Sequence, residues 1–193
     1  MKRARHRAAA PAAAPAFPDL RSASDRRVLA LFANRSLERA LRGQGKTNLE
    51  TVWQCASKEL RAPRSGAGRS APGPLDVHRR IVNGLPGIAL VIASAMAYDS
   101  MQEALPLFDL SAKTAKQRMW QTLAPNEGEI ALRIGRVLTI AGDALGSLDA
   151  ARQYLRTPNF ALGGAAPREL LRTAEGEQIV LAEIQAQAEG GPV

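Results

Sequence analysis

The sequence predicts an all-α fold. Of its 193 residues, 46% are apolar but only 4% are aromatic, and alanine, leucine and arginine, which lose little on entering a helix, are abundant. Apolar residues recur every three or four positions along most of the chain, and no segment shows the alternation of a half-buried strand. The length allows one domain with a proper core, or two small ones.

The N-terminal part of the chain, up to position 75, is expected to contain a tail, a helix pair and a linker. Residues 1–23 are basic and then rich in alanine and proline, which predicts a disordered tail rather than a signal peptide. Residues 24–61 are predicted to form two helices joined by the turn GQGKTN at 43–48. Such short helices bury little alone, so this pair should pack on a neighbour or a second subunit. Residues 62–75, rich in proline, glycine and serine, predict a flexible linker.

From Val77 onward the chain is expected to be nearly continuous helix with short breaks. Residues 87–98 are strongly apolar and should lie in the core, and residues 105–123 predict two short helices broken at 109–111. Residues 127–145 carry the clearest helical periodicity, which Gly146 ends. Shorter helices are predicted over 148–156 and 167–171, and a last one begins at the capping residue Thr173 and ends near Ala188.

The charge of the chain is uneven. Residues 1–74 hold 15 Lys and Arg against 5 Asp and Glu, whereas residues 75–193 hold 11 against 13. Basic segments attract nucleic acid of any sequence by releasing counterions. A basic first part and a mildly acidic remainder therefore suggest two kinds of partner.

One segment matches the loosest form of a phosphate-binding loop. Residues 40–47, ALRGQGKT, place Gly45, Lys46 and Thr47 in the required order. Such a loop needs a buried strand before it, so that backbone amides converge on the phosphates at a helix start. A helix is expected here instead, so the segment is interpreted as a turn between helices.

Groups that could support catalysis are sparse. The histidines are His6, in the tail, and His78, beside the linker, and Cys55 is the single cysteine. No metal-binding or paired-carboxylate pattern appears, so we expect no enzyme, no metal and no cofactor. The single cysteine suits a reducing cytoplasm, and no apolar run approaches the roughly 20 residues that span a bilayer, so no membrane partner is expected.

Residues 105–123 have the pattern of a helix-turn-helix. Ser111 is placed to cap the second helix through the amide of Thr114, and lysine and glutamine share its outer face. Those side chains are appropriate for phosphate and base-edge contacts in a major groove. An ordinary solvated helix face would show the same pattern, so both interpretations stay open. The candidate DNA-binding residues are Ser111, Lys113, Thr114, Lys116, Gln117 and Arg118.

The last two thirds of the chain resemble a known family. FDLSAKTAKQRM, followed by Leu123-Ala124-Pro125, resembles the divergent helix-turn-helix of the Xre/MbcA/ParS antitoxins. The segment from AGDALGSLDAARQYL to the final EGG resembles their toxin-binding domain nearly end to end, and the likeness covers about residues 80–193. Its marks are Leu145-Gly146, Ala150-Ala151, Tyr154-Leu155, Thr157-Pro158-Asn159, Leu162-Gly163-Gly164, Pro167, Leu170-Leu171, Thr173, Gly176 and Val180.

The resemblance implies a type II antitoxin. Members of the family are dimers that bind a toxin of the RES type, an ADP-ribosyltransferase-like enzyme that consumes NAD, and they often bind their own promoter. Their C-terminal domain covers the toxin's active site. Carried over, the candidate toxin contacts are Gly176, Val180, Ile184, Gln187, Gly190, Gly191, Pro192 and Val193.

Five regions follow from these patterns and from the resemblance: the tail (1–23), the helix pair (24–61), the linker (62–75), a helix-turn-helix region (76–126) and a toxin-binding domain (127–193). The tail, the helix pair and the linker lie outside the family pattern and have no assigned role. The alternative function is a stand-alone helix-turn-helix regulator of transcription whose C-terminal domain serves only to form dimers.

Overall fold

The computed structural model describes residues 17–43, 48–62 and 72–190, and the regular structure within these ranges is helical, which confirms the predicted all-α class. No helix in these ranges has both the length and the apolarity to cross a membrane. Along the chain the helices are α1 (Phe17–Phe32), α2 (Arg35–Arg42), α3 (Leu49–Arg61), α4 (Pro74–Val82), α5 (Ile88–Ala97), α6 (Met101–Phe108), α7 (Ala112–Arg118), α8 (Pro125–Ala144), α9 (Leu148–Arg156), the short 3₁₀ helix η1 (Phe160–Leu162), α10 (Pro167–Leu170) and α11 (Ala174–Ala188).

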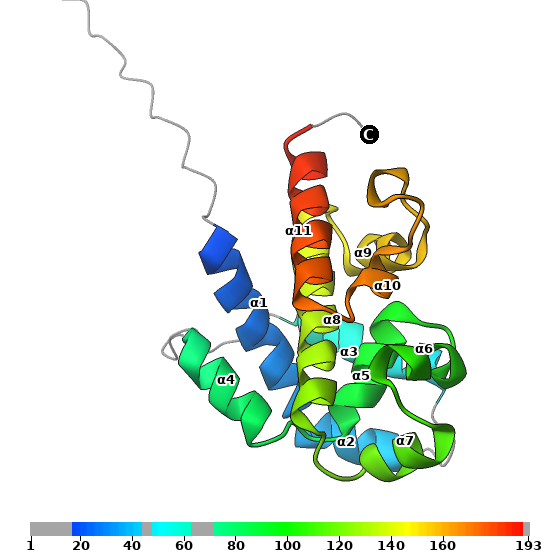
Figure 1. Ribbon diagram of the computed structural model, residues 1–193. Coiled ribbons are helices and arrows are strands. Elements are labelled where there is room, and N and C mark those ends of the chain that lie inside the picture. The colour runs from blue at the N-terminus through cyan, green and yellow to red at the C-terminus, as the bar shows by residue number, and fades with distance from the viewer. Residues whose placement is uncertain (1–16, 44–47, 63–71, 191–193) are drawn as a thin grey trace, which may run out of the picture.

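The long helix α8 forms the centre of the molecule. Fifteen of its twenty residues are buried, because α1, α5, α9 and α11 all pack against it (Figure 1). On one side α1 approaches so closely that a Cβ on Gly135 would lie 2.5 Å from a methyl group of Val28. The buried apolar residues form one cluster that runs from Val28 to Ile184, so the regions distinguished in the sequence share a single core.

The first N-terminal helix begins earlier than predicted, and the segment expected to be one helix is divided into two. Residues 17–23, expected in the tail, already belong to α1, whose Val28, Leu31 and Phe32 are buried against the rest of the core. The helix predicted over 24–41 is two helices, because the side chain of Asn34 accepts hydrogen bonds from the amides of Ser36 and Leu37 and starts α2. Residues 1–16 and most of the predicted linker lie outside the described residues.

Helix α3, the second helix of the predicted N-terminal pair, packs within the chain, on α5 and α9. The indole nitrogen Nε1 of Trp53 donates to Asp149 at 3.2 Å, and the guanidinium of Arg152 lies 4.9 Å from the centre of the Trp53 ring. Arg152 also pairs with Glu50 at 2.7 Å, and this hydrogen bond lowers the pKa of the Glu50 carboxyl. These contacts join α3 to α9, so one of the two expected alternatives, packing on a neighbouring part of the chain, is realised.

Three arginines bind the C-terminal end of the buried helix α5. All ten residues of α5 are buried, and the last carbonyls of a helix have no partner within it. Arg152 and Arg168 donate to the carbonyl oxygens of Ala95 and Ala97, each at 3.0 Å, and Arg156 donates to that of Tyr98. Positive charge also complements the negative end of the helix dipole. These bonds hold α9 and α10 against the central helices.

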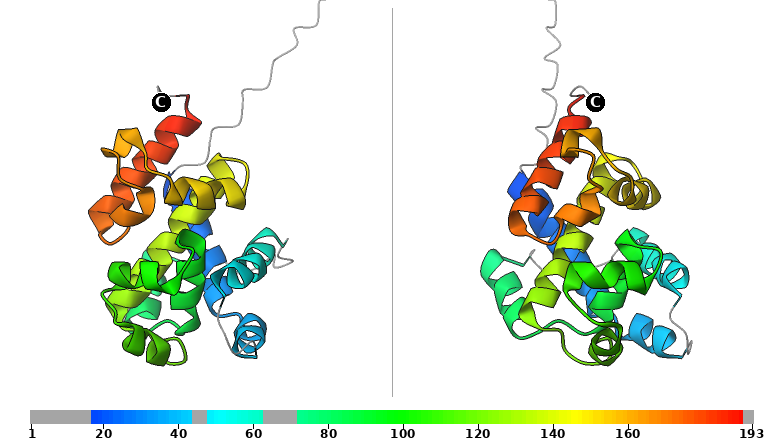
Figure 2. Two further views of the ribbon diagram at one scale, coloured as in Figure 1. Left: turned by 90° about the vertical axis from the view of Figure 1, so that its right-hand side faces the viewer. Right: turned by 45° about the vertical axis from the view of Figure 1, so that its right-hand side comes forward.

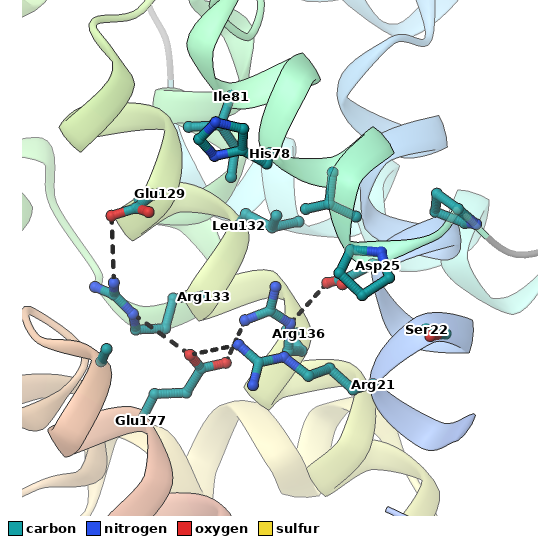
Figure 3. A pocket seen from close by; sticks show the side chains of 14 residues that line it. Arg21, Ser22, Asp25, His78, Ile81, Glu129, Leu132, Arg133, Arg136 and Glu177 are labelled. Atoms are coloured by element: carbon teal, nitrogen blue, oxygen red, sulfur yellow. Dashed lines mark hydrogen bonds and ion pairs between the residues drawn. The ribbon is translucent and has the colours of Figure 1, made fainter. Parts of the chain in front are cut away.

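A buried cluster of charges connects α1, α8 and α11. The carboxylate of Glu177 on α11 is 2% exposed and lies within ion-pair distance of Arg21, Arg133 and Arg136 (Figure 3). Arg136 on α8 also donates to Asp25 on α1 at 2.7 Å. The cluster lines a cavity of about 390 Å³ between these helices and α4.

Burial and pairing act in opposite directions on these charges. Burial raises the pKa of the Asp25 carboxyl despite the hydrogen bond and the positive charge of Arg136. For Arg136 burial opposes the charged form, but the hydrogen bond to Asp25 and the negative charge of Glu177 raise the pKa of its guanidinium. Arg136 is therefore charged, and it depends on both acidic partners.

We predict that Glu177→Gln destabilises the protein by about 3–5 kcal/mol, because it leaves buried guanidinium groups without their shared counter-charge. The control is Asp143→Asn, the same change in an ion pair between α1 and α8 where Asp143 is 54% exposed and lies 2.9 Å from Arg27. It should cost less than about 1 kcal/mol. Urea unfolding followed by circular dichroism measures both, and equal losses would contradict the role given to Glu177.

Candidate functional site

Helix α11 has one face in the core and one face in solvent. Val180, Leu181 and Ile184 are almost completely buried against the rest of the protein. The opposite side is exposed and carries Ile179, whose side chain is 52% exposed although it is large and apolar. Figure 2 shows α11 on the outside of the molecule, ending close to the C-terminus. The solvent face is therefore the part of α11 that a partner can reach.

The start of α11 depends on a glycine. The hydroxyl of Thr173 accepts from the amide of Gly176 at 3.0 Å, which confirms the predicted cap. A Cβ at Gly176 would lie 1.8 Å from the carbonyl oxygen of Leu170. The backbones therefore approach closely at Gly176, which brings α11 directly against α10.

The loop between α9 and α10 is held tightly beside α11. The side-chain oxygen of Asn159 accepts from the amide of Ala161 at 2.9 Å, and its amide group donates to Glu183 on α11 at 3.1 Å. Gly163 and Gly164 both have positive φ, 67° and 84°, which other residues rarely adopt. The loop therefore has one defined conformation against the helix.

Phe160, in this loop, is 98% exposed. Ile179, Glu183 and Gln187 are spaced four residues apart on α11 and so form a row that passes the loop. Glu183 also accepts from the side chain of Gln187 at 2.7 Å. We call Phe160 together with this row the η1–α11 surface. Its two large apolar side chains, Phe160 and Ile179, are both exposed to solvent.

A tyrosine lies under this surface. Burial raises the pKa of Tyr154 to about 12, and the negative charge of Glu183 adds to the effect. The phenol is therefore neutral at physiological pH. Tyr154 is also one of the residues that carry the resemblance to the antitoxin family.

The candidate toxin contacts predicted from the sequence divide between core and surface. Gly176, Val180 and Ile184 are buried inside the protein itself, so the side chains of Val180 and Ile184 support α11 instead of facing a partner. Gln187 belongs to the η1–α11 surface, and Gly190 is exposed with φ of 76°. Gly191, Pro192 and Val193 lie outside the described residues.

Sequence reasoning missed Phe160, and although it placed toxin contacts on the last helix from Ile179 to Ala188, it did not single out Ile179 as an exposed residue. Periodicity assigns apolar residues to the core, and nothing in the sequence marks an apolar residue that faces solvent. The position of Phe160 directly after the Thr157-Pro158-Asn159 break offered one signal, because a residue in a short loop has little chance of burial.

The second candidate site is the α6–α7 unit. Asp109, Leu110 and Ser111 separate the two helices, and Asp109 adopts the left-handed conformation with φ of 57°. The hydroxyl of Ser111 accepts from the amide of Thr114 at 3.1 Å, so the predicted cap is confirmed. The break predicted at 109–111 is also in place.

The candidate DNA-binding residues of α7 do not all face solvent freely. Lys113, Lys116 and Gln117 are exposed, whereas Ala115 between them is buried against α6 and the core. The hydroxyl of Thr114 lies 2.9 Å from that of Ser111, within the cap.

Arg118 pairs with the buried Glu127 at 3.3 Å, and Glu127 in turn accepts from the amide of Ala124 at the start of α8. Arg118 is thus engaged within the protein. The helix ends there because the next turn is bound to the segment before α5, where the amide of Gly87 donates to the carbonyl of Gln121 at 2.6 Å.

The other residues that the sequence singled out are placed only in part by the described residues. Within the described ranges, no three His, Cys, Asp or Glu side chains are placed to hold a metal ion. His78 is exposed on α4, and Gly45, Lys46 and Thr47 of the apparent phosphate-binding loop lie outside the described residues.

Comparison with known proteins identifies the C-terminal part of the chain. Residues 141–190 match the family described as the antitoxin Xre/MbcA/ParS C-terminal toxin-binding domain. No curated protein matches the chain. The matched residues contain α9, η1, α10 and α11, and hence the whole η1–α11 surface. Through residues 141–190 the chain is similar to the Xre/MbcA/ParS-type antitoxins, which supports an antitoxin role in a toxin–antitoxin system.

Proposed function

We propose that the protein neutralises a RES-type toxin, an ADP-ribosyltransferase-like enzyme that consumes NAD, by laying the η1–α11 surface over the toxin's active site. The observation that carries this proposal is the side chain of Phe160, which is 98% exposed inside the matched toxin-binding domain. An aromatic side chain in water gains free energy when a partner buries it. Exposed aromatic residues are frequently the residues that dominate binding energy at interfaces.

The rigidity of the η1 loop supports the same proposal. The side chain of Asn159 forms two hydrogen bonds. Its oxygen accepts from the amide of Ala161 within the loop, and its amide group donates to Glu183 on α11. A loop that is already ordered loses little conformational entropy when a partner binds, so more of the contact energy appears as affinity. The end of α11 continues this surface, and we propose that the residues after Gly190 extend it towards the cleft of the toxin.

Replacing Phe160 by serine is expected to weaken toxin binding by roughly 2 kcal/mol, or about 30-fold in Kd, without loss of thermal stability, because the side chain packs on nothing inside the protein. Ile179→Ser should have a smaller effect in the same direction. Titration of the purified toxin, scored by NAD consumption and by calorimetry, measures both.

The control is Leu75→Ser, on α4 and outside the matched domain, where an apolar side chain is 59% exposed. Its affinity for toxin should equal that of the original chain. Full inhibition by Phe160→Ser combined with Ile179→Ser would rule out the η1–α11 surface. Ile184 gives no such test, because its buried side chain cannot be made polar without destabilising α11.

A second activity, repression of its own operon as a homodimer in the cytoplasm, is also proposed. Its support is the exposed group of Lys113, Lys116 and Gln117 on one face of α7, with the opposite face packed in the core. Lysine contacts phosphates, and glutamine can pair with the edge of adenine.

Changing Lys113, Lys116 and Gln117 together to alanine should abolish gel shifts of the DNA upstream of the gene and leave toxin binding intact. The three side chains are exposed and alanine favours helix, so folding should be preserved. A shift that survives the triple substitution would remove α7 from the proposed DNA contact.

A stand-alone regulator with a dimerising C-terminal domain is the competing function. Co-expression with the product of the neighbouring gene separates the two. Relief of toxicity together with a purified complex supports neutralisation, whereas an absence of both leaves the regulator as the better account.

A further inference from the structure

We propose that α2, from the N-terminal part of the chain that lies outside the matched domain, is a second DNA-contacting element that binds the phosphate backbone beside α7. This inference rests on the proposed DNA binding by α7 and adds to it a site on a different helix. It also assigns a role to part of the N-terminal helix pair, which the family resemblance leaves without one.

The arginines of α2 form a row on its outer side. Arg35, Arg39 and Arg42 are spaced by four and three residues and are all exposed, whereas Leu37 and Leu41 face the core. Arg35 and Arg39 form no ion pair with any described residue. Like charges at this spacing repel and weaken a helix. Neutralisation by a row of phosphates would relieve that repulsion.

A stacking contact places this row next to the α6–α7 unit. The guanidinium of Arg42 lies 4.5 Å from the centre of the Trp120 ring, directly after α7, and Trp120 is 37% exposed. Arg42 is held in place by Glu38, which accepts from it at 2.7 Å and 3.1 Å. Figure 1 shows α2 and α7 at the same end of the molecule.

The short length of α7 makes a second element useful. It has seven residues, about 10 Å at 1.5 Å per residue, and Arg118 is engaged with Glu127. This leaves two lysines and a glutamine, a small number of contacts for binding at physiological salt. Two or three arginines on a neighbouring helix would add sequence-independent phosphate contacts without reading bases.

The chemistry of the arginine row on α2 indicates that the partner bound there is double-stranded DNA. The side chains of the row are cationic, and the large apolar residues of α2, Leu37 and Leu41, are turned into the core, which leaves Ala40 as the exposed apolar residue. The helix therefore has no large exposed apolar side chain to bury against a protein. DNA instead presents regularly spaced phosphates, which a row of arginines can neutralise with release of counterions.

The test uses the full chain and two labelled duplexes of equal length, one from the region upstream of the gene and one scrambled. In the double variant Arg35→Ala, Arg39→Ala, affinity for both duplexes should fall by the same factor, about tenfold at low salt. The slope of log affinity against log salt concentration should decrease by about 2, roughly one unit for each lost phosphate contact. Fluorescence anisotropy measures both quantities.

Two control variants make the result specific. Lys58→Ala with Arg172→Ala removes the same charge from exposed positions outside α2 and the α6–α7 unit, and should leave the salt slope unchanged. Arg35→Lys with Arg39→Lys keeps the charge and should retain most of the affinity, because a phosphate accepts either cation.

Each outcome decides the proposal. If the alanine variant keeps its DNA affinity and salt slope while the α7 triple variant loses binding, α2 is not a DNA contact although the proposed function stands. If the alanine variant loses toxin inhibition instead, α2 is a protein-binding surface. If the unaltered chain binds neither duplex, both the DNA part of the proposed function and this inference fail.

Discussion

The buried carboxylate of Glu177 is the interaction on which the arrangement of this protein most depends. It lies among Arg21, Arg133 and Arg136, and Arg136 also reaches Asp25, so a single charged cluster joins α1, α8 and α11. Charges taken out of water must be paired, and each member of such a cluster therefore restricts the position of the others. This cluster aligns α11, which carries the candidate toxin contacts, with the N-terminal helix α1.

Further contacts join residues 141–190, which match the toxin-binding domain, to the rest of the protein. Arginines of α9 and α10 bind the carbonyls at the end of α5, and Trp53 of α3 donates to Asp149 of α9. The face of α11 that remains in solvent is consequently held on a rigid support, with Phe160 beside it. A preformed surface of this kind loses little conformational entropy when a partner binds.

The opposite end of the molecule carries cationic side chains on two short helices. The packing of Arg42 on Trp120 brings α2 of the N-terminal pair beside the α6–α7 unit, although the two lie far apart in the sequence. Arg35, Arg39 and Arg42 of α2 and Lys113 and Lys116 of α7 therefore lie on two helices at the same end of the molecule (Figure 1). The η1–α11 surface is carried by other helices.

The sequence by itself determined the all-α class, the cap at Ser111 and the cap at Thr173, because these depend on local periodicity and local hydrogen bonds. Ordered marks along the chain also revealed the likeness of its C-terminal part to the antitoxin family, which residues 141–190 match. The sequence could not decide which side of α11 is free. Val180 and Ile184 appeared as contacts but are buried, whereas Phe160 and Ile179 are exposed. Nor could it place α2 beside α7 or pair Glu177 with three arginines. Only tertiary packing decided these points, because burial and ion pairing depend on which distant helices meet.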